Sequence, residues 1–190
     1  YNCKKMSKKL VLILALFSNV LLGQKKLDRF LAHPAKAELQ KVDLSNCNLD
    51  SLPPKLALCT RLVELNLSDN NLSEIPSYLS GFPLLKELNL QENKFTGLPR
   101  SLADAPALQR LLLAQNPITQ LTLKADAFPQ LIYLDLWDCE IQDIDPSICQ
   151  HSKLKEIDLR RNFLGTRDLE WLFECAPHIN IESTWGCNCD

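Results

Sequence analysis

Glycine and aromatic residues are scarce in this chain, and their scarcity excludes several classes of protein. Of the 190 residues only 5 are glycine and 11 are proline, and aromatic residues make up 7%. These fractions are too low for collagen or for proline- and glycine-rich disorder. Hydrophobic residues account for 46% of the chain, so we expect a single folded domain with a continuous core.

The sequence also lacks the short motifs that mark common catalytic sites. It has no G-x-S-x-G, no H-E-x-x-H, no phosphate-binding loop and no dinucleotide fingerprint. The acid pair Asp143 and Asp145 falls in a segment that has the character of a solvated bend. We therefore expect a protein that is not an enzyme and that carries no cofactor.

Positive charge is sparse beyond the first residues of the chain. The formal net charge is -2, but residues 1–23 contain four lysines and no acid, which leaves 17 basic and 23 acidic residues for the rest. The remaining lysines and arginines are scattered rather than clustered. Because an acidic body repels phosphates, we expect neither nucleic-acid binding nor attachment to an anionic membrane surface.

The beginning of the chain has the layout of a signal peptide. Lysines precede thirteen residues, Leu10 to Leu22, that are apolar except for Ser18 and Asn19. A helix that crosses a bilayer needs roughly 20 apolar residues, and this run is shorter. The pattern therefore favours a leader for export over a membrane-spanning helix.

Residues 1–23 are predicted to be this leader, with cleavage after Gly23. The residues before Met6 are interpreted as an extension of the reading frame. The alternative is an uncleaved anchor, because Leu21 stands where a small residue is preferred. A cleaved leader predicts a secreted, periplasmic or cell-surface protein that does not otherwise contact the membrane.

Leucine accounts for 39 residues, and a repeated segment explains its abundance. The segment follows the pattern L-x-x-L-x-L-x-x-N/C-x-L, as in LVELNLSDNNL, with other apolar residues at some of the leucine positions. Its six copies start 23 residues apart, at Leu39, Leu62, Leu85, Leu108, Leu131 and Leu154. A constant period of this length predicts a solenoid in which each coil shelters the leucines of its neighbours.

Alternation inside each copy predicts a short strand. Leu65 and Leu67 point to one side of such a strand, while Glu64 and Asn66 point to the other. Prolines such as Pro76 then interrupt an apolar stretch that is too irregular for a long helix, so the chain must turn back. Stacked coils would align their strands in one parallel sheet, with one face in the core and one in solvent.

The repeat resembles that of the leucine-rich repeat family, and residues 39–164 are identified as six such repeats. The units DSLPPKL, SEIPSYL and TGLPRSL are similar to the 23-residue class of exported bacterial members. The resemblance implies an α/β fold, a right-handed solenoid with a parallel, concave β-sheet and short helical caps at both ends. It also implies a non-catalytic module, expected as a monomer, that binds a protein or peptide partner on the concave face.

The ninth repeat position and the two ends of the chain have predicted structural roles in the solenoid. The ninth position is predicted to form a ladder of hydrogen bonds to the buried backbone, with these members: Cys47, Asn70, Asn93, Asn116, Cys139 and Asn162. Residues 24–38 have a helical spacing of apolar residues and are predicted to be an N-terminal cap. Residues 165–190 are predicted to be a helix and strand, with Thr166 as the helix cap, followed by a cysteine-containing tail.

The outward strand positions change character along the predicted solenoid. Early repeats offer acidic and polar side chains, whereas repeats four to six add aromatic and apolar ones. Because tryptophan, tyrosine and arginine dominate binding hot spots, this part of the concave face is the predicted partner-binding site. Its candidate residues are Arg110, Leu112, Tyr133, Asp135, Trp137, Asp158 and Arg160. The alternative interpretation is that these are ordinary exposed side chains, with Trp137 stacked on Arg160.

Cysteines and a histidine near the C-terminus leave a second functional hypothesis open. Cys175, His178, Cys187 and Cys189 offer the ligands of a metal site or the thiols of a redox pair. A disulfide from Cys175 to Cys187 or Cys189 is the alternative, with Cys149 as an exposed, unpaired thiol. The ending WGCNCD is also similar to the start of the cysteine-rich cap in extracellular animal leucine-rich repeat proteins.

Overall fold

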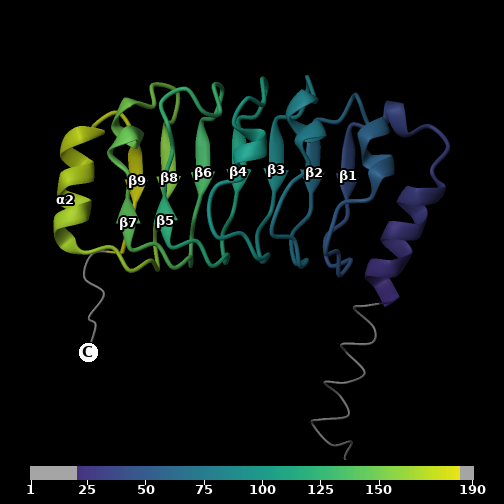
Figure 1. The fold of residues 1–190 in the computed structure, drawn as a ribbon, viewed down its shortest axis with the longest axis horizontal. Helices are drawn as coiled ribbons and strands as arrows, with labels where there is room; N and C mark the ends of the chain where they lie inside the picture. The colour runs from purple at the N-terminus through teal and green to yellow at the C-terminus, as the bar shows by residue number, and fades with distance from the viewer. Residues whose placement is uncertain (1–20, 185–190) are drawn as a thin grey trace, which may run out of the picture.

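A parallel sheet of seven short strands runs the length of the molecule (Figure 1). The computed structural model describes residues 21–184. The strands, in their order across the sheet, are β1 (Lys41–Asp43), β2 (Glu64–Asn66), β3 (Glu87–Asn89), β4 (Arg110–Leu112), β6 (Tyr133–Asp135), β8 (Glu156–Asp158) and β9 (Asn180–Glu182). Strands up to β8 pair one repeat apart, so that Leu65 lies beside Leu88 and Leu88 beside Leu111. The predicted solenoid with a parallel sheet is confirmed.

The inward side chains of the coils form one continuous core. Leucines at the sixth repeat position stack from coil to coil: Leu44, Leu67, Leu90, Leu113, Leu136 and Leu159. Each of them is no more than 2% exposed. Burying one leucine side chain contributes roughly 2 kcal/mol, and no coil can bury its leucines alone. The stack therefore stabilises all the coils jointly.

Short 3-10 helices carry the chain back from one strand to the next in most coils. They are η2 (Pro54–Leu58), η3 (Ser77–Gly81), η4 (Arg100–Leu102) and η5 (Pro146–Gln150), while η1 (Lys36–Glu38) precedes the first strand. Prolines at or just before the start of η2 to η5 favour such tight turns, because proline fixes φ and lacks a backbone N–H. Asp145 is the N-cap of η5 and accepts a hydrogen bond from the backbone N–H of Ser147 at 2.9 Å. Asp145 is therefore a helix cap, not a freely solvated acid.

The fourth and fifth coils contain a small second sheet on the side opposite the strands of the main sheet. Its strands are β5 (Gln120–Leu121) and β7 (Asp143–Ile144), which pair in parallel. The fourth coil has lost the Leu-Pro element of the earlier coils and instead buries Leu121 and Leu123, which alternate as in a strand. A short strand is thus added to the return path in these two coils, and in the fifth coil β7 is followed by η5.

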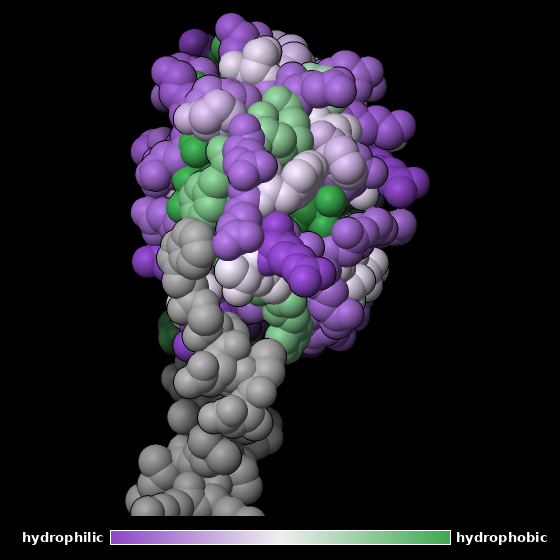
Figure 2. Space-filling model, turned by 90° about the vertical axis from the view of Figure 1, so that its left-hand side faces the viewer, coloured by the Kyte–Doolittle hydropathy of each residue, from purple (hydrophilic) through white to green (hydrophobic). Residues whose placement is uncertain are grey.

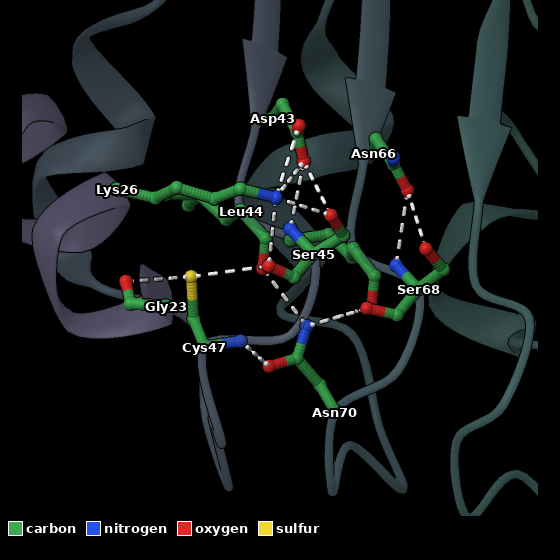
Figure 3. Close-up of polar contacts among 10 residues, drawn as sticks. Gly23, Lys26, Asp43, Leu44, Ser45, Cys47, Asn66, Ser68 and Asn70 are labelled. Atoms are coloured by element: carbon green, nitrogen blue, oxygen red, sulfur yellow. Dashed lines mark hydrogen bonds and ion pairs between the residues drawn. The ribbon is translucent and has the colours of Figure 1, made fainter. Parts of the chain in front are cut away.

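A ladder of side-chain amides ties each coil to its neighbours, as predicted (Figure 3). Asn70 Nδ2 donates to the carbonyl oxygens of Leu44 and Leu67, both at 2.9 Å. Asn70 Oδ1 accepts from the backbone N–H groups of Cys47 and Leu49. The same two-sided pattern recurs at Asn93, Asn116 and Asn162. The amides thus satisfy backbone groups that the sheet leaves without partners.

A helix over described residues 21–32 covers the first coil, at the end of the row opposite the C-terminal helix (Figure 1). Gly23 packs so closely on this coil that an added Cβ would overlap the carbonyl oxygen of Asn46. Lys26 Nζ lies 3.1 Å from a carboxylate oxygen of Asp43 and pairs with it (Figure 3). These contacts fix the helix against the open edge of β1, which a solenoid must shield from water and from other strands.

The helix α2 (Thr166–Cys175) and β9 close the other end of the solenoid. Leu172 is buried against the core, while hydrophilic side chains predominate on the end face that Figure 2 shows. The N-cap of α2 is Gly165, whose backbone N–H donates to the carboxylate of Asp168 at 3.0 Å. The prediction of Thr166 as the cap is wrong, because Thr166 is the first helical residue and Asp168 supplies the capping oxygen.

A disulfide joins Cys149 of η5 to Cys175 of α2, with their Cα atoms 5.4 Å apart. This pairing corrects two expectations, since Cys149 is not an unpaired thiol and Cys175 does not pair with Cys187 or Cys189. The reason is that α2 is the return segment between β8 and β9 and lies beside η5, the return segment of the coil before it. The bond fastens the C-terminal cap to the body of the solenoid.

Several sequence expectations lie outside the described residues. These are most of the predicted leader, in residues 1–20, and the tail of residues 185–190 with Cys187 and Cys189. Within residues 21–184, no helix combines the length and the hydrophobicity that crossing a bilayer requires.

Candidate interaction surface

We define the sheet surface as the side chains that the seven strands turn away from the core, together with the residue two positions beyond each strand. Strand register aligns these side chains in columns. The first column is Lys41, Glu64, Glu87, Arg110, Tyr133, Glu156 and Asn180, and the second is Asp43, Asn66, Asn89, Leu112, Asp135, Asp158 and Glu182. The third column is Ser45, Ser68, Gln91, Ala114, Trp137 and Arg160.

Side-chain oxygens of the second column hold the turn that follows each strand. Asp43 accepts from the backbone N–H of Ser45 at 2.9 Å, and Asn66 accepts from that of Ser68 at 3.1 Å (Figure 3). The same bond is made at Asn89, Asp135 and Asp158. Because leucine has no acceptor, Leu112 interrupts the series. Aspartate and asparagine therefore have the same structural role in this column, since either supplies the acceptor for the turn.

We call strands β1 to β3 the N-terminal half of the sheet surface and strands β6, β8 and β9 its C-terminal half, with β4 between them. Asp135 is a buried carboxylate on β6, in the C-terminal half. It is 7% exposed, and its second oxygen accepts a hydrogen bond from Gln91 Nε2 at 2.8 Å. Gln91 lies two coils away and reaches over the small side chain of Ala114. Burial raises the pKa of the Asp135 carboxyl above its usual value, and the nearby charge of Asp158 adds to the rise.

Asp158 is 4% exposed and lies against the guanidinium of Arg160. Arg160 Nε donates to both carboxylate oxygens of Asp158, at 3.0 and 3.2 Å. Its terminal nitrogen also lies 3.0 Å from a carboxylate oxygen of Glu182 on the last strand. One arginine thus shares its charge between two acids, and the pKa of its guanidinium rises as a result.

Two aromatic residues beside these acids each carry an arginine on one ring face. The guanidinium of Arg110 lies 4.2 Å from the ring centre of Tyr133, and that of Arg161 lies 5.0 Å from the ring of Trp137. Arg160 instead pairs with Asp158 and Glu182, so the stacking of Trp137 on Arg160 that the alternative interpretation expected is wrong. Both rings are half-buried, which holds them in place at the surface.

All the residues predicted to bind a partner come from the three neighbouring coils of β4, β6 and β8. They are Arg110, Leu112, Tyr133, Asp135, Trp137, Asp158 and Arg160. Their solvent exposure differs from the expectation in two cases, since Asp135 and Asp158 are buried by their column neighbours and by the hydrogen bonds described above. Leu112, Tyr133 and Trp137 are half-buried, and the two arginines are exposed.

Sequence reasoning did not select four residues that shape this part of the surface. Gln91 and Glu156 occupy aligned repeat positions, but the repeat spacing does not tell how far a side chain reaches across coils. Glu182 belongs to the irregular last unit. Arg161 lies one residue beyond the aligned columns, where each coil turns with a positive φ, of 59° in this case.

The two halves of the sheet surface differ in how their charges are balanced. In the N-terminal half each acid has a basic partner: Asp43 with Lys26, Glu64 with Lys41, and Glu87 with Arg110. In the C-terminal half Arg160 is the only base of the columns, and it pairs with Asp158 and Glu182. Among the described residues, Asp135 and Glu156 have no ion-pair partner.

The alternative of a metal or redox site at the C-terminus depends on a free Cys175 thiol, which the structure does not contain. Cys175 is bonded to Cys149, and residues 21–184 contain no group of three side chains suited to hold a metal ion. The free cysteines of the described chain are buried: Cys47, Cys59 and Cys139. Burial raises the pKa of each of these thiols, to about 11 for Cys139, and so suppresses the reactive thiolate.

Comparison with known proteins agrees with this architecture. Models of the leucine rich repeat match residues 37–95 and 61–118, and a further leucine rich repeat model matches residues 130–152. No curated protein matches the chain significantly.

Among solved structures, a leucine-rich repeat protein of Leptospira interrogans is similar, with a TM-score of 0.59 and 22% sequence identity. The match covers 82% of this chain but only 45% of that structure. Identity at this level shows a shared fold and nothing finer. Because the repeat models match more than half of the residues and the coils stack as such repeats require, this chain belongs to the leucine-rich repeat family.

Proposed function

We propose that this chain is a non-catalytic, monomeric binding module of an exported protein, and that it holds a protein or peptide partner on the sheet surface over β4, β6 and β8. One observation carries the proposal: Tyr133 and Trp137 are half-buried on that surface, and each ring is held by a stacked arginine. Aromatic residues fixed in advance lose little conformational entropy on binding and are typical anchors of interfaces.

Membership of the leucine-rich repeat family supports the same function, since such repeats commonly serve as protein-interaction modules and are typically not enzymes. The acid excess of the chain beyond residue 23 disfavours nucleic acid as the partner. The protein would therefore recognise another polypeptide.

Export is supported by the disulfide between Cys149 and Cys175 together with the leader-like beginning of the sequence. Structural disulfides persist in oxidising compartments and are rare in the reducing cytosol. We therefore propose that the protein works in the periplasm, at the cell surface or in the medium.

The proposal is tested by selecting binders from a displayed library of random peptides on the folded wild-type protein. Replacing Trp137 by alanine is expected to weaken selected peptides by about 2 kcal/mol, or roughly thirtyfold in Kd. A matched control is Leu58→Ala, which removes an exposed hydrophobic side chain from η2, away from the sheet surface. Calorimetric titration measures both, and the thermal unfolding midpoints of all three proteins should agree closely.

Selected peptides that bind Trp137→Ala and Tyr133→Ala as tightly as the wild type would refute the proposed site. Peptides that lose affinity equally with Leu58→Ala would refute it as well, because they would not discriminate between the two sides of the solenoid.

A further inference from the structure

We infer that the partner presents a cationic segment to the sheet surface, with an arginine or lysine side chain placed over Asp135 and Glu156 between Tyr133 and Trp137. The inference rests on the proposed function and adds the chemistry of the partner.

The charges of the sheet surface are unevenly balanced along one continuous sheet. In the N-terminal half, Lys26, Lys41 and Arg110 each neutralise one acid of the sheet surface. In the C-terminal half, four acids stand against one base: Asp135, Glu156, Asp158 and Glu182 against Arg160. The surplus of negative charge therefore lies over β6, β8 and β9 and overlaps the proposed binding site at β6 and β8, where a cationic partner would complement it.

The turn after β6 does not need the charge of Asp135. The turn after the strand requires a side-chain acceptor for the backbone N–H of Trp137, at 3.0 Å. In the N-terminal half Asn66 and Asn89 supply that acceptor without any charge. A carboxylate at 7% exposure costs desolvation that an amide would avoid, so its presence is best explained by a positive charge that arrives from outside.

The two rings beside Asp135 favour a planar positive group. Tyr133, Asp135 and Trp137 are successive outward positions of one coil, so the carboxylate lies between two rings. The surface already holds guanidinium groups against these rings, at 4.2 Å for Arg110 and 5.0 Å for Arg161. A planar guanidinium from the partner can both bond a carboxylate and stack on an aromatic face, which makes arginine the better of the two cationic residues.

The test uses two fluorescent peptides of equal length, with arginine at alternate positions in one and glutamate at those positions in the other. Glycine and serine fill the remaining positions. Fluorescence anisotropy with the folded protein is expected to give at least about tenfold tighter binding of the arginine peptide at about 0.05 M salt, and a smaller difference at about 0.3 M.

Two double variants separate a local effect from the effect of net charge. Asp135→Asn with Glu156→Gln is expected to lose at least about tenfold in affinity for the arginine peptide. Asp43→Asn with Glu64→Gln removes the same charge from the N-terminal half, keeps the acceptor for the Ser45 backbone, and should change that affinity less than about twofold. Circular dichroism and thermal unfolding of both variants confirm that each remains folded.

Equal loss in the two double variants would overturn the inference, since the peptide would then respond only to overall charge. Equal binding of the arginine and glutamate peptides would overturn it too. The proposed function fails separately: if displayed peptides depend on Trp137 but carry no basic residues, the binding site stands and the cationic partner does not.

Discussion

The N-terminal and C-terminal halves of the sheet surface are built from the same repeat but present different chemistry. Strands β1 to β3 and strands β6, β8 and β9 pair in one sheet in the same parallel manner, and their second-column residues hold the turns in the same way. In the first half the acids are paired with bases, whereas the second half has aromatic side chains, a buried aspartate and surplus negative charge. The repeat sets where a side chain points, and the residue placed there decides what the surface binds.

The opposite side of the solenoid changes character at nearly the same place along the chain. The first three coils return through 3-10 helices, while the fourth and fifth coils contain the β5 and β7 pair. The disulfide lies beyond this change and fastens only the C-terminal end. The C-terminal half thus departs more from the regular repeat, both in how the chain returns between strands and in the side chains of the sheet surface. Each of the following predictions tests that contrast.

Loss of the disulfide is expected to have the largest effect. Its closed loop spans 26 residues, which corresponds to about 3.5 kcal/mol of stabilisation in the chain-entropy treatment. Urea unfolding of the reduced protein, or of Cys149→Ser with Cys175→Ser, measures the loss. Hydrogen exchange should accelerate first in β8 and β9 and least in β1 and β2. Equal acceleration in every strand would contradict a role confined to the C-terminal half.

Interrupting the amide ladder is expected to cost nearly as much. Asn116 Nδ2 donates to the carbonyl oxygens of Leu90 and Leu113, and its oxygen accepts from the backbone N–H of Phe95. Asn116→Ala leaves these buried groups without partners and should cost about 3 kcal/mol in urea unfolding.

The matched control for the ladder is Cys139→Ala in the next coil. The Cys139 thiol makes a weak hydrogen bond to the carbonyl oxygen of Leu113 at 3.4 Å, so its loss should cost about 1 kcal/mol. If the two variants lose equal stability, cysteine holds the ladder as well as asparagine does, and the two coils are equivalent in this respect.

Second-column acids should contribute unequally to stability in the two halves. Asp158→Ala removes a buried carboxylate that bonds the backbone N–H of Arg160 and its side chain, and should cost about 2 kcal/mol. Asp43→Ala removes the exposed equivalent in β1, with its surface pair to Lys26, and should cost less than about 1 kcal/mol. Chemical unfolding at neutral pH compares them, and the reverse order would show that exposure does not set the difference.

The smallest expected effect is a pH-dependent one at Asp135. Burial raises the pKa of this carboxyl in the folded state, so its contribution to stability is greatest at low pH and is lost as the pH rises through the raised pKa. Asp135→Asn does not titrate and keeps the acceptor for Trp137. The stability of this variant relative to wild type should therefore rise from about pH 3 through the raised pKa and then become constant. A difference that does not vary with pH in urea unfolding would contradict this prediction.

Much of the architecture could be predicted because the repeat period determines it. Leucines 23 residues apart must share one interior, and the asparagine at Asn70 must face the backbone of the coil before it. The predicted site residues come together for the same reason, since positions in register lie on adjacent strands. Their burial could not be predicted, because Gln91 covers Asp135 from two coils away and no spacing rule describes that reach.

Contacts between residues that are not one repeat apart, and contacts of the two end caps, depended on tertiary structure. Cys149 pairs with Cys175 because α2, the return segment of the last full coil, lies beside η5, and Arg161 rather than Arg160 lies on Trp137 because the chain turns with a positive φ there. The sequence by itself determined the coil, the core and the columns, since each depends on spacing along the chain. Only the tertiary structure decided the contacts outside the 23-residue register, such as Gln91 with Asp135 or Cys149 with Cys175, since these depend on distances between side chains that the repeat spacing does not fix.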